Sequence, residues 1–154
     1  MTNNTYQSQF VVLKNFLENK RNIKVILKSG VFDAWYPALS RIHINKNLKW
    51  RERFFTLLHE AGHALIDTDL TIKHKTCFGQ TNPSNVRSRK AFVHTINNEI
   101  MAWNKGKEIA EMLNFIVGTK KFEEYMTNCI MSHVKYGLKE LYGREIDVTS
   151  IRDC

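Results

Sequence analysis

"RFFTLLHEAGHALID", residues 53–67, places two histidines four positions apart and a glutamate directly after the first histidine. On an α-helix, which turns about 100° per residue, His59, Glu60 and His63 share one side. The opposite side is apolar and consists of Leu57, Leu58, Ala61, Ala64 and Leu65. The segment therefore predicts a helix that is buried on most sides and presents two imidazoles in one direction.

The spacing of these histidines suits a zinc ion. His59 and His63, at positions i and i+4, can direct ring nitrogens at one ion about 2.0–2.1 Å away. Glu60 projects beside that ion, where it can accept a proton from a zinc-bound water whose pKa is lowered to about 7. The alternative is a histidine pair that is satisfied within the core. We favour zinc because H-E-x-x-H seldom arises by chance in a chain with six histidines.

A catalytic zinc usually has three protein ligands and a water, so a third ligand should follow downstream. The candidates are His74, His94, Glu99, Glu108, Glu111 and His133. Glu99 is favoured because it shares a helical face with Trp103 and other apolar or small residues, where an unpaired carboxylate is costly. A bound metal would offset that cost, as would pairing with a buried arginine or tyrosine. His94 is the alternative third ligand and would give a three-histidine site.

The rest of the chain predicts a single α+β domain over residues 1–154. Helical spacing predicts helices over 5–20, 95–117 and 120–136, whereas β-branched or alternating runs predict strands over 22–30 and 40–45. Residues 68–90 have no sustained period and predict a long loop. We expect a small antiparallel sheet of two to three strands, packed with the H-E-x-x-H helix and further C-terminal helices.

The composition predicts a cytoplasmic protein that does not enter membranes. No apolar run reaches the ~18–20 residues needed to cross a bilayer, and residues 1–16 lack the features of an export signal. Three cysteines at wide spacing argue against a disulfide framework and for a reducing interior. The net charge of +8 fits a solvated basic surface, an acidic protein partner or weak contact with nucleic acid, and residues 85–90 are the densest basic patch.

Two segments resemble the ImmA/IrrE-like metallopeptidases. "IHINKNLKWRERFFTLLHEAGHALI" (42–66) is similar to the core of that family, and "NEIMAW" (98–103) is similar to its glutamate-bearing helix. The resemblance implies a minimal gluzincin-like fold, one Zn²⁺ per chain and hydrolysis of a peptide bond in a protein, often a transcriptional repressor or other regulator. It makes His59 and His63 zinc ligands, Glu60 the general base and Glu99 the third ligand. A stand-alone protease of a phage or mobile element would fit this pattern.

Several further features have more than one interpretation. Asp67, one turn after His63, is either a partner that orients a ligand histidine or a helix-end carboxylate. Strand 40–45, if it is a free edge, could align a substrate backbone. The basic loop 68–90 should border the cleft and favour an acidic segment of the substrate. The transition state also needs a hydrogen-bond donor, for which the candidates are Tyr36, His74, Tyr125, His133 and Tyr136.

Two other functions are compatible with the sequence. One is a DNA-associated metalloprotease with a three-histidine zinc site, in which residues 85–90 contact phosphate and binding depends steeply on salt. The other is a non-catalytic, zinc-stabilised regulatory binding protein. In that case a fourth protein ligand, such as His74 or Cys77, would close the open position on the metal.

Overall fold

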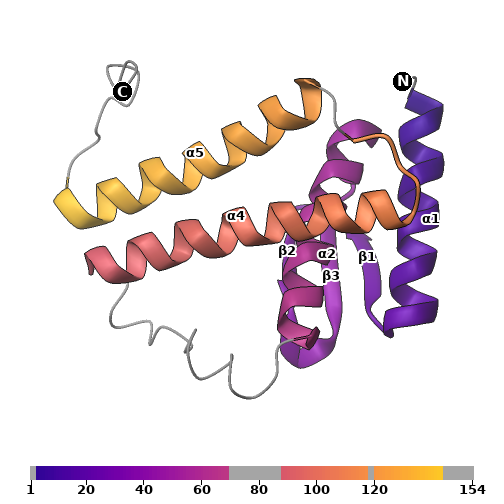
Figure 1. The fold of residues 1–154 in the computed structure, drawn as a ribbon, viewed down its shortest axis with the longest axis horizontal. Coiled ribbons are helices and arrows are strands. Elements are labelled where there is room, and N and C mark those ends of the chain that lie inside the picture. Colours follow the sequence, from indigo (N-terminus) through magenta and orange to yellow (C-terminus); the bar gives the residue numbers. More distant parts are fainter. Residues whose placement is uncertain (1–2, 70–87, 118–119, 144–154) are drawn as a thin grey trace.

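In the computed structural model, which describes residues 3–69, 88–117 and 120–143, the chain forms four α-helices and a three-stranded sheet within those ranges (Figure 1). The helices are α1 (Asn3–Arg21), α2 (Trp50–Asp69), α4 (Arg89–Met112) and α5 (Lys120–Tyr142). The strands are β1 (Lys24–Lys28), β2 (Ala34–Tyr36) and β3 (Arg41–Asn45), with a short 3-10 helix, η1 (Pro37–Leu39), between β2 and β3. The α+β class and the small sheet are confirmed.

The sheet is mixed, with β3 in the centre. β2 pairs with β3 antiparallel, but β1 pairs with β3 parallel, so the prediction of a fully antiparallel sheet was wrong. The two connections explain the difference. Pro37 and the left-handed Ser40 (φ 47°) turn the chain back tightly between β2 and β3. β2 follows β1 in the sequence and runs in the opposite direction. The turn between β2 and β3 reverses the chain a second time, so β3 runs in the same direction as β1.

One face of the sheet is covered by α1 and α2. The strands contribute Val25, Ile42 and Ile44 to the core, because alternate residues of a strand point to the same face. The two helices add large apolar side chains to the same core, namely Phe10, Leu13, Leu17, Phe54, Phe55, Leu57 and Leu58. Burying one such side chain contributes roughly 1.5–3 kcal/mol. The H-E-x-x-H helix is therefore fixed through the apolar side that the sequence predicted.

α4 crosses α2 with the two backbones in contact. A Cβ on Gly62 of α2 would lie 2.0 Å from the Ala102 carbonyl oxygen of α4. A Cβ on Gly106 of α4 would lie 2.8 Å from the Leu58 carbonyl oxygen of α2. The helices can approach this closely because both positions lack a side chain. The crossing brings Glu99 of α4 next to the histidines of α2.

The boundaries of α4 differ from the predicted 95–117. The helix begins at Arg89, because the Ser88 hydroxyl accepts a hydrogen bond from the Ala91 N–H and caps the first turn. It ends at Met112, since Asn114 adopts a left-handed conformation (φ 56°). α2 also continues to Asp69, so residues 68–69 and 89–90, which were predicted to belong to a loop, are helical. Residues 70–87, and with them His74 and Cys77, lie outside the described residues.

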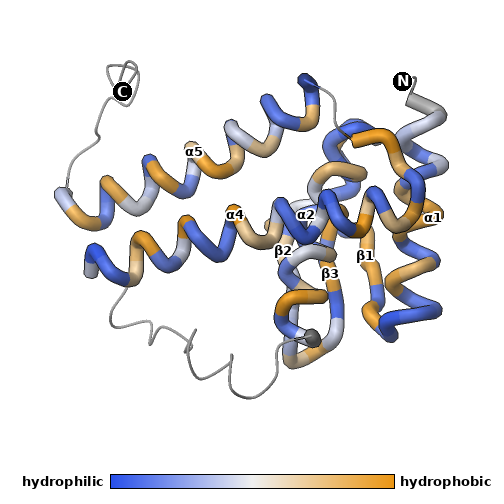
Figure 2. The backbone as a smooth tube through the Cα atoms, in the orientation of Figure 1, coloured by the Kyte–Doolittle hydropathy of each residue, from blue (hydrophilic) through white to orange (hydrophobic). Residues whose placement is uncertain are grey.

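α5 continues to Tyr142, beyond its predicted end at 136, and packs against α4. Figure 2 shows hydrophobic and hydrophilic residues alternating along both helices, as in amphipathic helices. The apolar face of α5 contacts the core: Phe122 is buried, and Tyr125, Met126, Cys129 and Ile130 are partly buried against it. No helix in the described part of the chain is long and apolar enough to span a membrane.

Candidate metal centre

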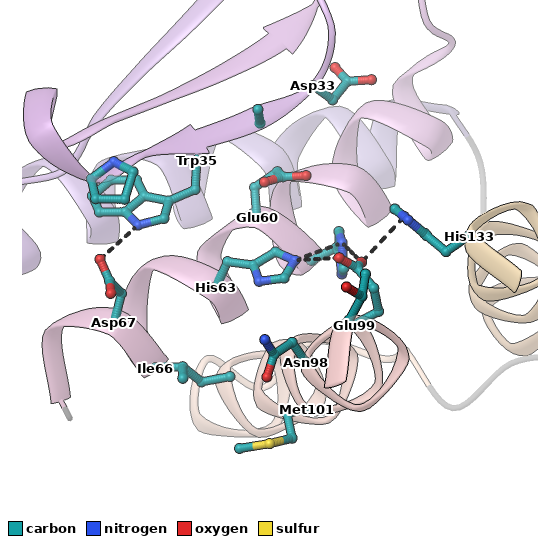
Figure 3. A pocket seen from close by; sticks show the side chains of 14 residues that line it. Asp33, Trp35, Glu60, His63, Ile66, Asp67, Asn98, Glu99, Met101 and His133 are labelled. Atoms are coloured by element: carbon teal, nitrogen blue, oxygen red, sulfur yellow. Dashed lines mark hydrogen bonds and ion pairs between the residues drawn. The ribbon is translucent and has the colours of Figure 1, made fainter. Parts of the chain in front are cut away.

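His59, His63 and Glu99 form a compact cluster between α2 and α4 (Figure 3). The Nε2 atoms of His59 and His63 are 3.2 Å apart. Glu99 Oε2 lies 3.0 Å from His59 Nε2, and Glu99 Oε1 lies 3.6 Å from His63 Nε2. Within the described ranges, these three residues form the one group of three or more His, Cys, Asp or Glu residues whose ligand atoms converge within 4.8 Å.

The donor atoms of this cluster suit a metal ion. Two donors that each lie about 2.0–2.1 Å from a tetrahedral zinc are separated by roughly 3.3 Å. The three observed separations lie close to that value. Two imidazoles and one carboxylate also leave a fourth position open, as catalytic zinc sites do. The cluster is therefore compatible with a bound metal ion.

The ring of His59 is oriented by stacking. Trp103, one turn after Glu99 on α4, stacks on it with ring centroids 4.3 Å apart and an interplanar angle of 23°. Nδ1 of His59 is buried and has no hydrogen-bond partner among the residues that the structure describes. In metal sites a hydrogen-bond acceptor for the second ring N–H often orients a ligand histidine. Here the Trp103 indole orients His59 by stacking. The sequence predicted Trp103 on the helical face of Glu99 but not its stacking on His59. The i, i+4 spacing of Glu99 and Trp103 was the available signal for this contact.

The electrostatics of the cluster hold Glu99 as an anion. Burial alone would raise the pKa of Glu99, but hydrogen bonds with His59 and His63 hold it well below its usual range. Burial lowers the pKa of His59, which favours its neutral, metal-binding form. Burial also acts to lower the pKa of His63, but the Glu99 carboxylate outweighs it and the net shift is upward. The cluster thus favours a positive charge next to the Glu99 carboxylate.

Glu60 lies beside the cluster and is not part of it. Its side chain is almost fully buried, and burial raises its pKa to about 7. The charge of His63 and a hydrogen bond from the Trp35 backbone N–H oppose that shift. Glu60 and Trp35 line the same cavity of about 520 Å³ as His59 and His63. A carboxyl group with a pKa near neutrality can both accept and release a proton there.

The other candidate third ligands on α4 do not join the cluster. His94 precedes Glu99 by five residues, which places it about 140° away around the helix. It is half-buried and lies outside the group of converging ligand atoms. Glu108 is largely exposed and pairs with Lys105 at 2.9 Å, and Glu111 is exposed.

Asp67 and His133 approach the site in ways that the sequence did not specify. The Asp67 carboxylate accepts a hydrogen bond from the Trp35 indole at 3.3 Å. This bond connects α2 to β2 and does not involve a histidine of the cluster. His133 reaches in from α5, with its Nε2 atom 3.4 Å from Glu99 Oε2 and 43% of its side chain exposed. It lines the cavity opposite α2 (Figure 3).

The structure also separates the candidate transition-state donors. Tyr125 is hydrogen-bonded to Thr56 at 2.9 Å inside the helical layer. Tyr136 is 62% exposed, and Tyr36 lies against His43 with ring centroids 4.6 Å apart. None of these three tyrosines lines the cavity, whereas His133 does.

A family model described as the IrrE N-terminal-like domain, a peptidase family, matches residues 19–143. This match covers most of the sequence and includes every residue of the cluster. The chain belongs to the IrrE N-terminal-like peptidase family. No curated protein and no solved structure matches the sequence.

Membership of the IrrE N-terminal-like family confirms the resemblance found in residues 42–66 and 98–103. The match begins within α1 and ends after α5, so it extends beyond the segments in which the resemblance was found. A peptidase family and a His–His–Glu cluster together support a metallopeptidase-type function.

Proposed function

We propose that this protein is a zinc-dependent endopeptidase in which His59, His63 and Glu99 hold the ion and Glu60 is the general base. The observation that carries the proposal is the convergence of three ligand atoms in a cavity that Glu60 also lines. In the described part of the chain no fourth His, Cys, Asp or Glu joins this group. An open position is what a catalytic zinc requires, and a purely structural zinc site lacks one.

In this mechanism, zinc when bound supplies Lewis acidity to the peptide carbonyl and to the attacking water. Glu60 accepts the proton of that water and then passes it to the leaving amine. Its pKa of about 7 suits both transfers, and the Trp35 N–H holds its carboxylate in the cavity. His133 is positioned on the opposite wall to donate a hydrogen bond to the developing oxyanion.

Substrate alignment should use β2. The strand first considered for that role, residues 40–45, forms β3 in the centre of the sheet and has no free edge. β2 is an edge strand, and Ala34 and Trp35 line the cavity. A substrate in extended conformation could pair with this edge and pass across the cluster. Ile66 and Met101, which line the cavity beside His63 (Figure 3), supply an apolar wall for one of its side chains.

The substrate class that we propose is a protein regulator, such as a repressor, with an acidic segment near the cleavage site. The net charge of +8 and the exposed Arg89 and Lys90 at the start of α4 support an acidic partner.

Metal content and turnover test this proposal together. Purified protein should carry close to one zinc per chain, and His59→Ala or His63→Ala should abolish that binding. Glu60→Gln should keep the metal and lose cleavage of a protein substrate by at least ~100-fold, because it removes the group that moves the proton. Cleavage by Glu60→Gln at the wild-type rate would show that the assigned mechanism is wrong.

The third ligand needs a separate pair of variants. Glu99→Ala should weaken zinc binding sharply, whereas His94→Ala, on the same helix, should leave it near wild type. Isothermal titration of metal-free protein with zinc measures both. The reverse result would support the three-histidine site and refute the ligand set proposed above.

A further inference from the structure

The outer face of the sheet, turned away from α1 and α2, carries a cluster of cationic and aromatic side chains. We define this surface by Lys24, Lys28, Tyr36, Arg41 and His43. Lys24, Lys28, Arg41 and His43 are out of phase with the buried Val25, Ile42 and Ile44 along β1 and β3, and therefore point to the side opposite the core. Tyr36 is the register partner of Arg41 and lies on the same side. Lys24, Lys28, Arg41 and Tyr36 are exposed, and His43 is partly exposed.

The strand register concentrates positive charge on this surface. Lys24 of β1 and Arg41 of β3 are direct partners in the parallel pair, and Tyr36 of β2 is the partner of Arg41 on its other side. Like charges placed opposite one another on neighbouring strands oppose folding. The three strands contain no Asp or Glu, and no ion pair recorded for the described residues involves Lys24, Lys28 or Arg41. Sheet stability therefore gives no reason for these cations to be together.

Two carboxylates that bond to the strands are engaged with other groups. Glu18 Oε1 accepts a hydrogen bond from the Val25 N–H at 3.1 Å and lies 3.9 Å from Lys14 Nζ. Asp33 precedes β2, but its Oδ1 atom accepts a hydrogen bond from the Asn45 N–H at 2.6 Å, and the residue lines the cavity on the other side. The positive charge of the outer face thus stays available to an external anion.

Aromatic rings accompany the cations. The Tyr36 and His43 rings contact each other with centroids 4.6 Å apart and an interplanar angle of 46°. Phe32, just before β2, is 90% exposed. Cations alone would bind any anion, but rings exposed on a sheet beside cations also offer surfaces on which bases can stack.

We propose that the outer sheet face binds single-stranded nucleic acid, with Lys24, Lys28 and Arg41 contacting phosphates and Tyr36 and His43 stacking on bases. An acidic peptide is the less suitable partner, because its carboxylate side chains do not stack on the exposed rings. This surface is separated from His59 and Glu99 by the sheet itself, so the proposal does not depend on the peptidase function.

Fluorescence anisotropy with the full chain tests this binding, using labelled dT15 and rU15 as probes between 50 and 200 mM salt. Both should bind, and the logarithm of the affinity should fall against the logarithm of salt with a slope of about −2, as expected for three phosphate contacts to a single strand. Lys24→Ser/Lys28→Ser/Arg41→Ser should bring the slope near zero. Tyr36→Ala should weaken binding roughly tenfold or more and leave the slope unchanged.

A matched control separates this surface from net charge. Lys120→Ser/Lys121→Ser/Lys135→Ser removes three exposed lysines of α5 and leaves the same net charge as the triple variant of the outer face. It should bind like wild type. An equal loss of affinity in this control would refute the proposal. So would a decaglutamate peptide that competes fully while Tyr36→Ala has no effect, because the partner would then be an acidic protein. Circular dichroism of each variant confirms that it is folded.

Discussion

At the scale of single residues, one cavity gives two carboxyl groups opposite properties. Glu99 is surrounded by histidine nitrogens, which hold its pKa well below the usual range. Glu60 is turned toward β2, where burial dominates and raises its pKa to about 7. Two carboxyl groups whose environments separate their pKa values in this way are suited to different roles. Here the anionic Glu99 suits a metal ligand, and the titratable Glu60 suits a proton carrier.

The pKa of Glu60 predicts how the stability of metal-free protein depends on pH. Its carboxyl group titrates near 7 when folded and near 4.5 when unfolded, so the folded state binds more protons between these values. The free energy of unfolding should therefore fall as pH rises from 4.5 to 7, by about 1.4 kcal/mol per pKa unit and ~3 kcal/mol in all. Glu60→Gln removes this contribution.

Urea unfolding of chelator-treated protein between pH 5 and 8 measures this effect as the difference between wild type and Glu60→Gln. Glu108→Gln, on the exposed side of α4, is the control and should follow wild type at every pH. If the curves for wild type and Glu60→Gln stay parallel, Glu60 does not titrate in this range.

At the scale of the elements, the crossing of α2 and α4 sets the position of Glu99 relative to His59 and His63. Gly62 and Gly106 let the two backbones touch, and Trp103 of α4 stacks on His59 of α2. The buried residues of α4 lie mainly in its second half: Ala102, Trp103, Gly106, Ile109 and Ala110. Glu99 stands just before that half, so its position depends on how closely the two helices approach.

Gly62→Ala should destabilise the protein although alanine is the better helix former. Higher helix propensity would contribute about 1 kcal/mol. A Cβ only 2.0 Å from the Ala102 carbonyl oxygen meets backbone, which cannot rotate away, and overpacking of this kind costs about 1–3 kcal/mol or more. We expect a net loss of at least ~1 kcal/mol and weaker zinc binding, since α4 must move away from α2.

Thermal unfolding and zinc titration measure both effects. Asn15→Ala, at an exposed position of α1, gains helix propensity without a clash and should not lower stability. Zinc binding of Gly62→Ala at the wild-type level would mean that the crossing does not set the position of Glu99.

At the scale of the whole molecule, a metal ion would link parts of the chain that are distant in sequence. Its ligands come from α2 and α4, and His133 of α5 contacts Glu99 from a third helix. The first half of α4 has few buried residues of its own. The apolar core extends from the sheet, α1 and α2 into the second half of α4 and the start of α5, which contribute Trp103, Ile109 and Phe122 to it.

Removal of zinc should therefore destabilise some elements of the fold more than others. At free zinc 100-fold above its dissociation constant, binding would stabilise the folded state by about 2.7 kcal/mol, and chelation should lower the melting temperature accordingly. Hydrogen exchange should increase around Glu99 in α4 and around His133 in α5, with little change in β3 and α1. An equal increase in all elements, or none, would contradict this picture of the metal as the link between α2 and the C-terminal helices.

Features that depend on neighbours along one helix or strand could be predicted from the sequence alone. The face of His59, Glu60 and His63, the apolar side opposite, and the unusual place of Glu99 on an apolar face all follow from helical periodicity, which is local. The alternation in residues 41–45 predicted β3 for the same reason. The family resemblance rested on these same short segments.

The packing of separate helices and strands sets which distant groups meet. Glu99 reaches the histidines because α4 crosses α2, and His133 reaches Glu99 because α5 packs against α4. The chemistry of the six candidate ligands does not reveal these contacts. The parallel pairing of β1 with β3 and the edge position of β2 likewise depend on contacts between separate strands. Periodicity reports which side of an element is buried, but the partner it is buried against is set by the packing of the whole chain.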